Sequence, residues 1–143
     1  MDCRLKKLTE MNMHNTLSIA IIDKHPILRI GLDFILKHLY YESILLESVS
    51  ISAFKKTYPD QNPDLIILAI GQTDSRNNLA FINSAKKWYN SANIIVYDEE
   101  SDPCMVSDYL DAGVHGYVSK QGKITELVAC ILDVMDGNCY VRV

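Results

Sequence analysis

The residues best suited to chemistry in this 143-residue chain are carboxylates and lysines that directly follow short apolar runs. Asp23 and Lys24 follow one such run, Asp98 follows another, and Lys120 comes just after a third. Carboxylates bind hard divalent cations, and a lysine ammonium neutralises charge on an anionic group. These side chains can act together only if the fold brings the ends of the three runs to one place.

Apolar periodicity predicts an alternation of strands and helices from Leu17 onwards. Five apolar runs predict strands at residues 17–22, 44–49, 65–70, 93–97 and 116–119. The intervening and following segments predict helices at residues 26–39, 50–58, 79–88, 104–112 and 125–136. Pro26 suits a first helical position, Ser50 can cap the second helix, and Gly113 suits the left-handed residue after the fourth.

Three of the predicted helices repeat apolar residues at helical spacing. The first does so at Ile27, Ile30, Phe34 and Leu39. The third is expected to turn inward Leu79, Ile82, Ala85 and Trp88. The last gathers on one face Leu127, Val128, Ile131, Leu132 and Met135, and Gly137 ends it.

Five strands, each followed by a helix, predict an α/β protein with a flavodoxin-like, doubly wound, five-stranded parallel sheet covered on both faces. The chain is too short for an eight-fold barrel. We expect residues 1–16 to be a flexible tail, 17–137 to form the domain, and 138–143 to begin a linker. In such sheets ligands bind at the carboxyl ends of the strands, so Asp23, Ala69, Asp98 and Lys120 become candidate site residues.

Composition excludes several classes of protein. No apolar run is longer than six residues, the length of Leu65–Ile70, and this is far fewer than the roughly 20 residues that span a bilayer. The net charge of −4 argues against a basic nucleic-acid binder. We expect neither a clustered metal site nor disulfides in a cytoplasmic protein whose cysteines and histidines are scattered along the chain. These residues are Cys3, Cys104, Cys130, Cys139, His14, His25, His38 and His115.

Three segments carry a more specific signal: residues 21–32 (IIDKHPILRIGL), 63–69 (PDLIILA) and 110–120 (LDAGVHGYVSK). Because of these segments, residues 17–137 resemble a two-component response regulator receiver domain of the NarL/LuxR type, which has the CheY-like fold. The resemblance implies an aspartate after the third strand that accepts a phosphoryl group from a kinase. It also implies acidic residues that hold Mg²⁺, a lysine that pairs with the phosphoryl group, and a Ser/Thr and an aromatic residue that respond to it.

This chain matches that pattern only in part. Asp23 stands at the first acidic position, Tyr117 at the aromatic position and Lys120 at the lysine position. Three positions depart from the pattern: Lys24 replaces the second acid, Ala69 replaces the phosphoacceptor and Asp98 replaces the Ser/Thr. The usual negative pocket becomes neutral. We therefore expect no catalytic residue, no cofactor, and lost or weak Mg²⁺ binding, with Lys24 bridging Asp23 and Asp98 in place of the metal.

The sequence thus predicts a non-enzymatic pseudo-receiver in signal transduction and transcription regulation. It would bind a partner protein or form a homodimer, through its first and last helices or through its fourth helix, fifth strand and fifth helix. DNA would be bound only by a LuxR-type domain missing beyond Val143. One alternative is a working phosphorelay receiver that uses Asp98 or Asp74, and another is a flavodoxin-like enzyme or small-molecule binder. His25 is interpreted as a structural residue at a helix start.

Overall fold

The computed structural model describes residues 16–71, 75–99 and 102–142. Its elements, in chain order, are β1 (Ser18–Ile22), α2 (Pro26–Leu39), β2 (Ile44–Ser48), α3 (Ile51–Thr57), β3 (Leu65–Ile70), α4 (Ser75–Trp88), β4 (Asn93–Asp98), α5 (Pro103–Asp111), β5 (Gly116–Ser119), α6 (Ile124–Met135) and β6 (Tyr140–Arg142). The predicted five helices and five strands are all present. No helix in these ranges combines the length and hydropathy needed to cross a membrane.

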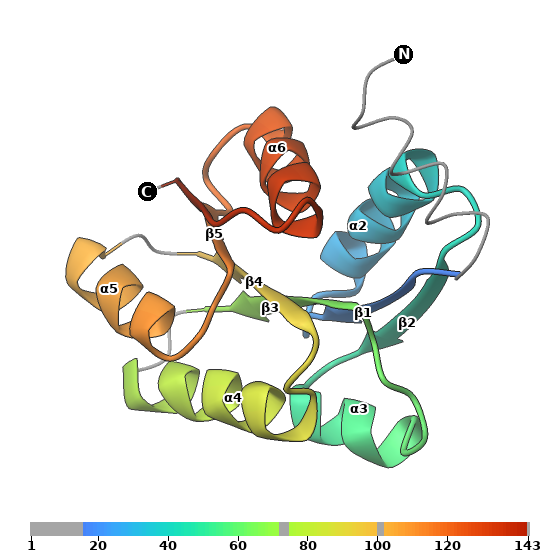
Figure 1. The fold of residues 1–143 in the computed structure, drawn as a ribbon, viewed down its shortest axis with the longest axis horizontal. Coiled ribbons are helices and arrows are strands. Elements are labelled where there is room, and N and C mark those ends of the chain that lie inside the picture. The colour runs from blue at the N-terminus through green and yellow to red at the C-terminus, as the bar shows by residue number, and fades with distance from the viewer. Residues whose placement is uncertain (1–15, 72–74, 100–101, 143) are drawn as a thin grey trace.

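The strands form one parallel sheet in the order β2-β1-β3-β4-β5-β6. Helices α2 and α6 cover one face, and α3, α4 and α5 cover the other (Figure 1). The doubly wound α/β fold is therefore confirmed. The sheet has six strands rather than five because residues 140–142, assigned to a linker from the sequence, add a short strand beside β5.

The central strand β3 explains why the sheet is buried on both sides. Its side chains alternate between two hydrophobic cores. Ile66, Leu68 and Ile70 pack on the α3–α5 side, whereas Leu65 and Ile67 pack on the α2/α6 side. A strand with apolar residues on both faces reads as a continuous apolar run, as the sequence shows.

Local signals in the sequence set several helix ends. Pro26 occupies the first turn of α2. The Ser50 side chain accepts a hydrogen bond from the Ala53 backbone N–H at 3.1 Å and so caps α3. Gly113 and Gly137 have φ of 102° and 88°, the left-handed conformation expected after a helix.

In two helices, the residues that face the sheet differ from those that the apolar periodicity predicted. In α2 the sheet-facing residues are Leu32 and Leu36, whereas Ile27, Ile30 and Phe34 point outward. In α4 the predicted inward Trp88 is 37% exposed, and the neighbouring Tyr89 is the buried aromatic residue. Periodicity finds an apolar stripe on a helix but cannot say which of two stripes meets the sheet.

Candidate functional site

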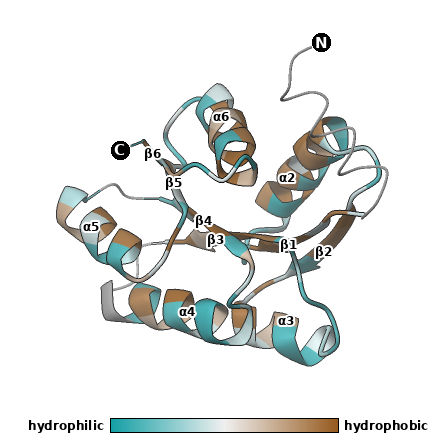
Figure 2. Cartoon of the chain, viewed as in Figure 1, coloured by the Kyte–Doolittle hydropathy of each residue, from teal (hydrophilic) through white to brown (hydrophobic). Residues whose placement is uncertain are grey.

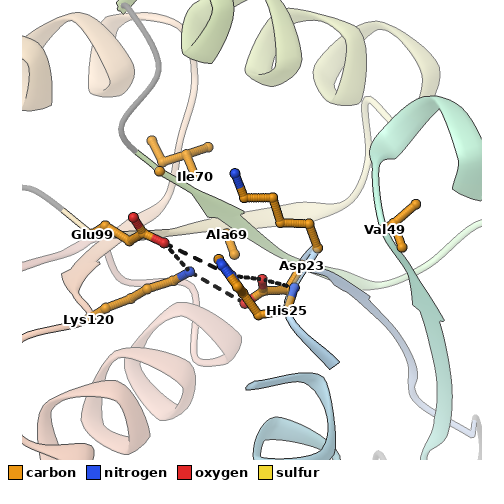
Figure 3. A pocket seen from close by; sticks show the side chains of 9 residues that line it. Asp23, His25, Val49, Ala69, Ile70, Glu99 and Lys120 are labelled. Carbon is orange, nitrogen blue, oxygen red and sulfur yellow. Dashed lines mark hydrogen bonds and ion pairs between the residues drawn. The ribbon is translucent and has the colours of Figure 1, made fainter. Parts of the chain in front are cut away.

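A small pocket of about 80 Å³ opens at the carboxyl ends of β1, β3, β4 and β5. Four of the candidate residues line it, namely Asp23, Lys24, Ala69 and Lys120. The remaining lining residues are His25, Val49, Ile70, Gly71 and Glu99. Figure 3 shows Asp23, His25, Glu99 and Lys120 converging beside the short side chain of Ala69.

Asp23 is the most buried charged residue of the pocket, at 1% exposure. Its Oδ1 accepts a hydrogen bond from the His25 backbone N–H at 2.9 Å and lies 3.1 Å from His25 Nδ1. Its Oδ2 lies 3.4 Å from Lys120 Nζ. The Arg29 guanidinium donates to the Asp23 carbonyl oxygen at 2.6 Å and holds the backbone after β1. A carboxylate this deeply buried needs such partners.

Lys120 is the residue directly after β5, and its side chain, which is only 10% exposed, reaches into the pocket. Besides Asp23, its ammonium lies 3.8 Å from Glu99 Oε1. It also sits 5.5 Å from the centre of the Tyr97 ring, a cation–π distance. Burial, and then the charge of Asp23, raise the pKa of the Tyr97 hydroxyl. The lysine is thus neutralised by groups of this chain.

Glu99 and His25 complete the network, and sequence reasoning did not assign either to the site. The Glu99 carboxylate lies 4.0 Å from His25 Nδ1, and its backbone carbonyl accepts from Gln121 Nε2 at 3.1 Å. Glu99 could have been predicted from the alternation of side chains between the two faces of β4. Tyr97 pairs in register with Ala69, and Glu99 lies two residues further along the same face.

Lys24 does not form the predicted bridge between Asp23 and Asp98. It lies at the rim of the pocket and is exposed, and among the described residues it makes no ion pair. The reason is that the carboxylates of its two predicted partners already contact other residues. Lys120 and His25 contact the Asp23 carboxylate, and Asp98 bonds elsewhere.

Asp98 and Tyr117 lie together, apart from the pocket lining. The Tyr117 hydroxyl donates to Asp98 Oδ2 at 2.6 Å, and the two residues are 0% and 4% exposed. The Tyr117 ring lies 6.3 Å from that of Tyr109, whose hydroxyl accepts from Asn78 Nδ2 at 3.1 Å. Asp98 is one residue out of phase with the pocket-facing side of β4, so its side chain enters the core under α4 and α5.

The remaining expectations concern metal ligands, cysteines and Asp74. Within the described ranges no group of three His, Cys, Asp or Glu residues is arranged to hold a metal ion. Cys104, Cys130 and Cys139 are free. Asp74, Cys3 and His14 lie outside the described residues.

The chain is similar to several known regulatory proteins. The profile of the response regulator receiver domain family matches residues 19–132. The chain is 25% identical over 128 residues to the transcriptional regulatory protein RcsB of Salmonella typhi, which covers 88% of this chain and 59% of RcsB. It is 22% identical over 126 residues to the oxygen regulatory protein NreC of Staphylococcus epidermidis, covering 87% of this chain and 57% of NreC. The chain therefore spans less than two thirds of these relatives.

Solved structures show the same fold. The isolated receiver domain of RcsB from Salmonella enterica serovar Typhimurium, in the presence of the phosphomimetic BeF3⁻, superposes with a TM-score of 0.77 at 23% identity, covering 90% of this chain and 94% of that domain. A LuxR-family two-component response regulator from Aurantimonas gives a TM-score of 0.75 at 21% identity, covering 88% and 89% of the two chains.

Proposed function

This chain belongs to the response regulator receiver domain family, and on that premise we propose that it is a pseudo-receiver, a cytoplasmic signalling module that acts without phosphorylation. Its output would be binding to a protein, including a second copy of itself, and it would carry no enzymatic activity. It would form the N-terminal part of a LuxR-type regulator that contacts DNA through a further domain.

The observation that carries the proposal is Ala69 at the end of β3, where the family resemblance places the phosphoacceptor aspartate. An alanine methyl group has no lone pair with which to attack phosphorus. In-line transfer also needs the reacting atoms about 3–3.5 Å apart. The 4% exposed Asp98, whose carboxylate is bonded to Tyr117, does not line this pocket.

The residues present do not fit Mg²⁺. Asp23 is the one acid retained after β1, and its carboxylate already contacts His25 and Lys120. Lys24 stands where a second carboxylate would be needed. The charged side chains of the pocket, two acids and two lysines, balance one another. Hard divalent cations prefer several oxygen ligands with surplus negative charge, which this set does not offer.

The buried Asp98–Tyr117 pair supports the absence of a phosphorylation-driven switch. In the family the aromatic residue on the fifth strand turns inward when the domain is phosphorylated. Here Tyr117 is already fully buried and is held by a 2.6 Å hydrogen bond. A ligand shifts a conformational equilibrium only through its different affinity for the two states. A domain already held in one state has its output set by partner binding.

The test is incubation of the chain with acetyl phosphate and Mg²⁺, followed by intact mass measurement, and with beryllofluoride and Mg²⁺, followed by thermal unfolding. We expect no mass adduct and no Mg²⁺-dependent rise in Tm. The matched control is the double variant Ala69→Asp/Lys24→Asp, which restores an acceptor and a second acid and is expected to gain that rise. Ala69→Asp alone lacks the second acid and is expected to gain less.

An adduct on the unmodified chain would overturn the proposal and favour a working phosphorelay receiver. Peptide mapping would then assign the acceptor, with Asp98→Asn as the variant that separates Asp98 from Asp74.

A further inference from the structure

Strand β2 forms one edge of the sheet, and part of its backbone faces outward. The described residues place β1 on one side of β2 and no strand on the other. The Ile44 N–H and the Ser48 carbonyl bond to the residues on either side of β1, at 2.7 and 3.0 Å. Backbone groups alternate in direction along a strand. The N–H and carbonyl groups of Leu45 and Glu47 therefore point to the free edge, where a further strand could bond to them.

A groove of about 460 Å³ lies along the carboxyl half of β2, between α2 and α3. Residues 47–49 line its floor, Arg29 and Ile30 belong to its α2 wall, and Ala53 and Thr57 belong to its α3 wall. Figure 1 shows β2 at the rim of the sheet, with α2 on one side and α3 on the other. Neighbouring strands of a sheet lie about 4.8 Å apart. A strand added to β2 would therefore occupy this groove.

The surroundings of the free edge are apolar and balanced in charge. Ile30, Ile44 and Val49 are 66%, 48% and 55% exposed, and Figure 2 shows the hydrophobic stretch that begins β2. Arg29 and Glu47 are the charged residues that line the groove, and Arg29 Nε lies 3.7 Å from Glu47 Oε1. Because these two charges offset each other, the groove favours an uncharged partner.

The opposite edge of the sheet is protected against pairing, whereas β2 is not. Strand β6 has three residues, and its Arg142 is exposed and lies 3.6 Å from Glu126. Short edge strands and charged side chains discourage the addition of another strand. Strand β2 has five residues, with neither proline nor lysine among them, and Glu47 is its single charged residue. Of the two edges, β2 is therefore the one suited to accept a strand.

We propose that the free edge of β2 binds an extended segment of a partner protein, an uncharged stretch rich in β-branched residues, which adds to the sheet as a further strand. Its backbone bonds to the N–H and carbonyl groups of Leu45 and Glu47, and its side chains point alternately toward α2 and α3. In such complexes the backbone supplies affinity and the alternate side chains supply specificity. This inference rests on the proposed function, because it names the partner and the surface through which the pseudo-receiver acts.

The test is a fluorescence anisotropy titration of the complete chain into a fluorescein-labelled heptapeptide of alternating threonine and valine. We expect saturable binding by the unmodified chain and binding weakened about tenfold or more by Glu47→Pro, which removes an outward N–H. Proline is tolerated in an edge strand where its ring faces away from the sheet, so this variant should still fold. Glu47→Ala is the matched control, because it removes the same carboxylate and keeps the N–H. Absence of binding by the unmodified chain, or equal binding by the two variants, overturns the inference.

Filling the groove from its α3 wall tests the site without altering the strand. Ala53→Leu extends a side chain into the groove and is expected to weaken peptide binding with the Tm little changed. Ser52→Leu is its control, because Ser52 is an exposed residue of α3 that does not line the groove. A loss of binding caused by Ser52→Leu and not by Ala53→Leu contradicts the site.

Amide hydrogen exchange measured by NMR tests the backbone contacts directly. Peptide addition is expected to slow exchange at the outward N–H groups of Leu45 and Glu47. The Leu46 N–H, which points to β1, should change least and serves as the internal reference. Peptide binding that leaves exchange at Leu45 and Glu47 unaltered places the peptide elsewhere and refutes strand addition.

Treatment with acetyl phosphate keeps the two proposals distinguishable. A chain that takes up no phosphoryl group and binds no peptide refutes the strand-addition site and leaves the pseudo-receiver intact. A chain that takes up a phosphoryl group and binds the peptide with unchanged affinity refutes the pseudo-receiver and leaves the site intact. A dimer in sedimentation equilibrium that the peptide dissociates would assign the edge to a second copy and overturn the choice of partner.

Discussion

Replacing Tyr117 with phenylalanine tests the buried pair that holds the fifth-strand aromatic residue inward. The variant keeps the ring and removes only the hydroxyl that donates to Asp98 Oδ2 at 2.6 Å. Asp98 is 4% exposed, so water cannot readily replace the lost donor. Hydrogen bonds to charged groups contribute about 1.5–3 kcal/mol, and a buried acceptor deprived of a donor bears the desolvation cost. For a domain of this size that corresponds to a fall in Tm of roughly 5–10 °C.

The assay is urea unfolding at neutral pH, with the free energy of unfolding compared at equal m-value. Tyr89→Phe is a matched control, because Tyr89 is 3% exposed and its hydroxyl has no hydrogen-bond partner among the described residues. Its removal should leave stability unchanged or raise it, since an unpaired buried polar group costs about 1–3 kcal/mol. A loss below about 0.5 kcal/mol for Tyr117→Phe, or equal losses for both variants, would refute the reasoning, since surface-like effects are of that size.

Three further predictions follow from local contacts. Ser50→Ala removes the 3.1 Å cap on the Ala53 N–H and should cost about 1 kcal/mol in urea unfolding, whereas Ser50→Gly should cost only a few tenths. Burial raises the pKa of the Cys130 thiol from 9.0 to about 12, so Cys130 should resist alkylation at pH 8. Between those two pKa values the unfolded chain loses this proton first, so the thiol should lower stability by about 1.4 kcal/mol per pH unit as pH rises, a slope that Cys130→Ala removes. Burial lowers the pKa of His115, whose Nδ1 accepts from the Ile94 N–H at 3.1 Å. Below the unfolded pKa of about 6.5 the unfolded chain binds the extra proton, so the free energy of unfolding should fall with acidification. This fall should be less steep in His115→Gln. Equal pH slopes in variant and parent would contradict either assignment.

The element types could be predicted from the sequence because each depends on short-range physics. The continuous apolar run 65–70 predicted a central strand, and Pro26 and Ser50 marked helix starts that the structure confirms. The start of α4 was placed four residues too late, at Leu79 instead of Ser75. Its polar first turn, Ser-Arg-Asn-Asn, carries no apolar period from which a helix could be recognised.

The residues of the pocket were predicted only in part, because side chains alternate between the two faces of a strand and the sequence did not show which of them face the pocket. Asp23, Ala69 and Lys120 were expected at the carboxyl ends of their strands, and all three line the pocket. Asp98 was expected in the same pocket because it follows a strand and stands at the Ser/Thr position of the family, but the register pairs Tyr97 with Ala69 and turns Asp98 to the other face of the sheet. A shift of one residue along a strand reverses the side to which a side chain points.

The sequence by itself determined the fold class, through an alternation of apolar strands and helices, and it predicted a site in which Ala69 stands where the family resemblance places the phosphoacceptor. These properties are encoded by residue type and period, so no knowledge of contacts is needed. Only the tertiary structure decided which charges meet. Glu99 and His25 join Asp23 and Lys120, Lys24 remains exposed, and Ile27, Ile30 and Phe34 face outward. Such choices depend on which strand lies beside which and on which helix face meets the sheet. Both are set by contacts between residues far apart in the sequence.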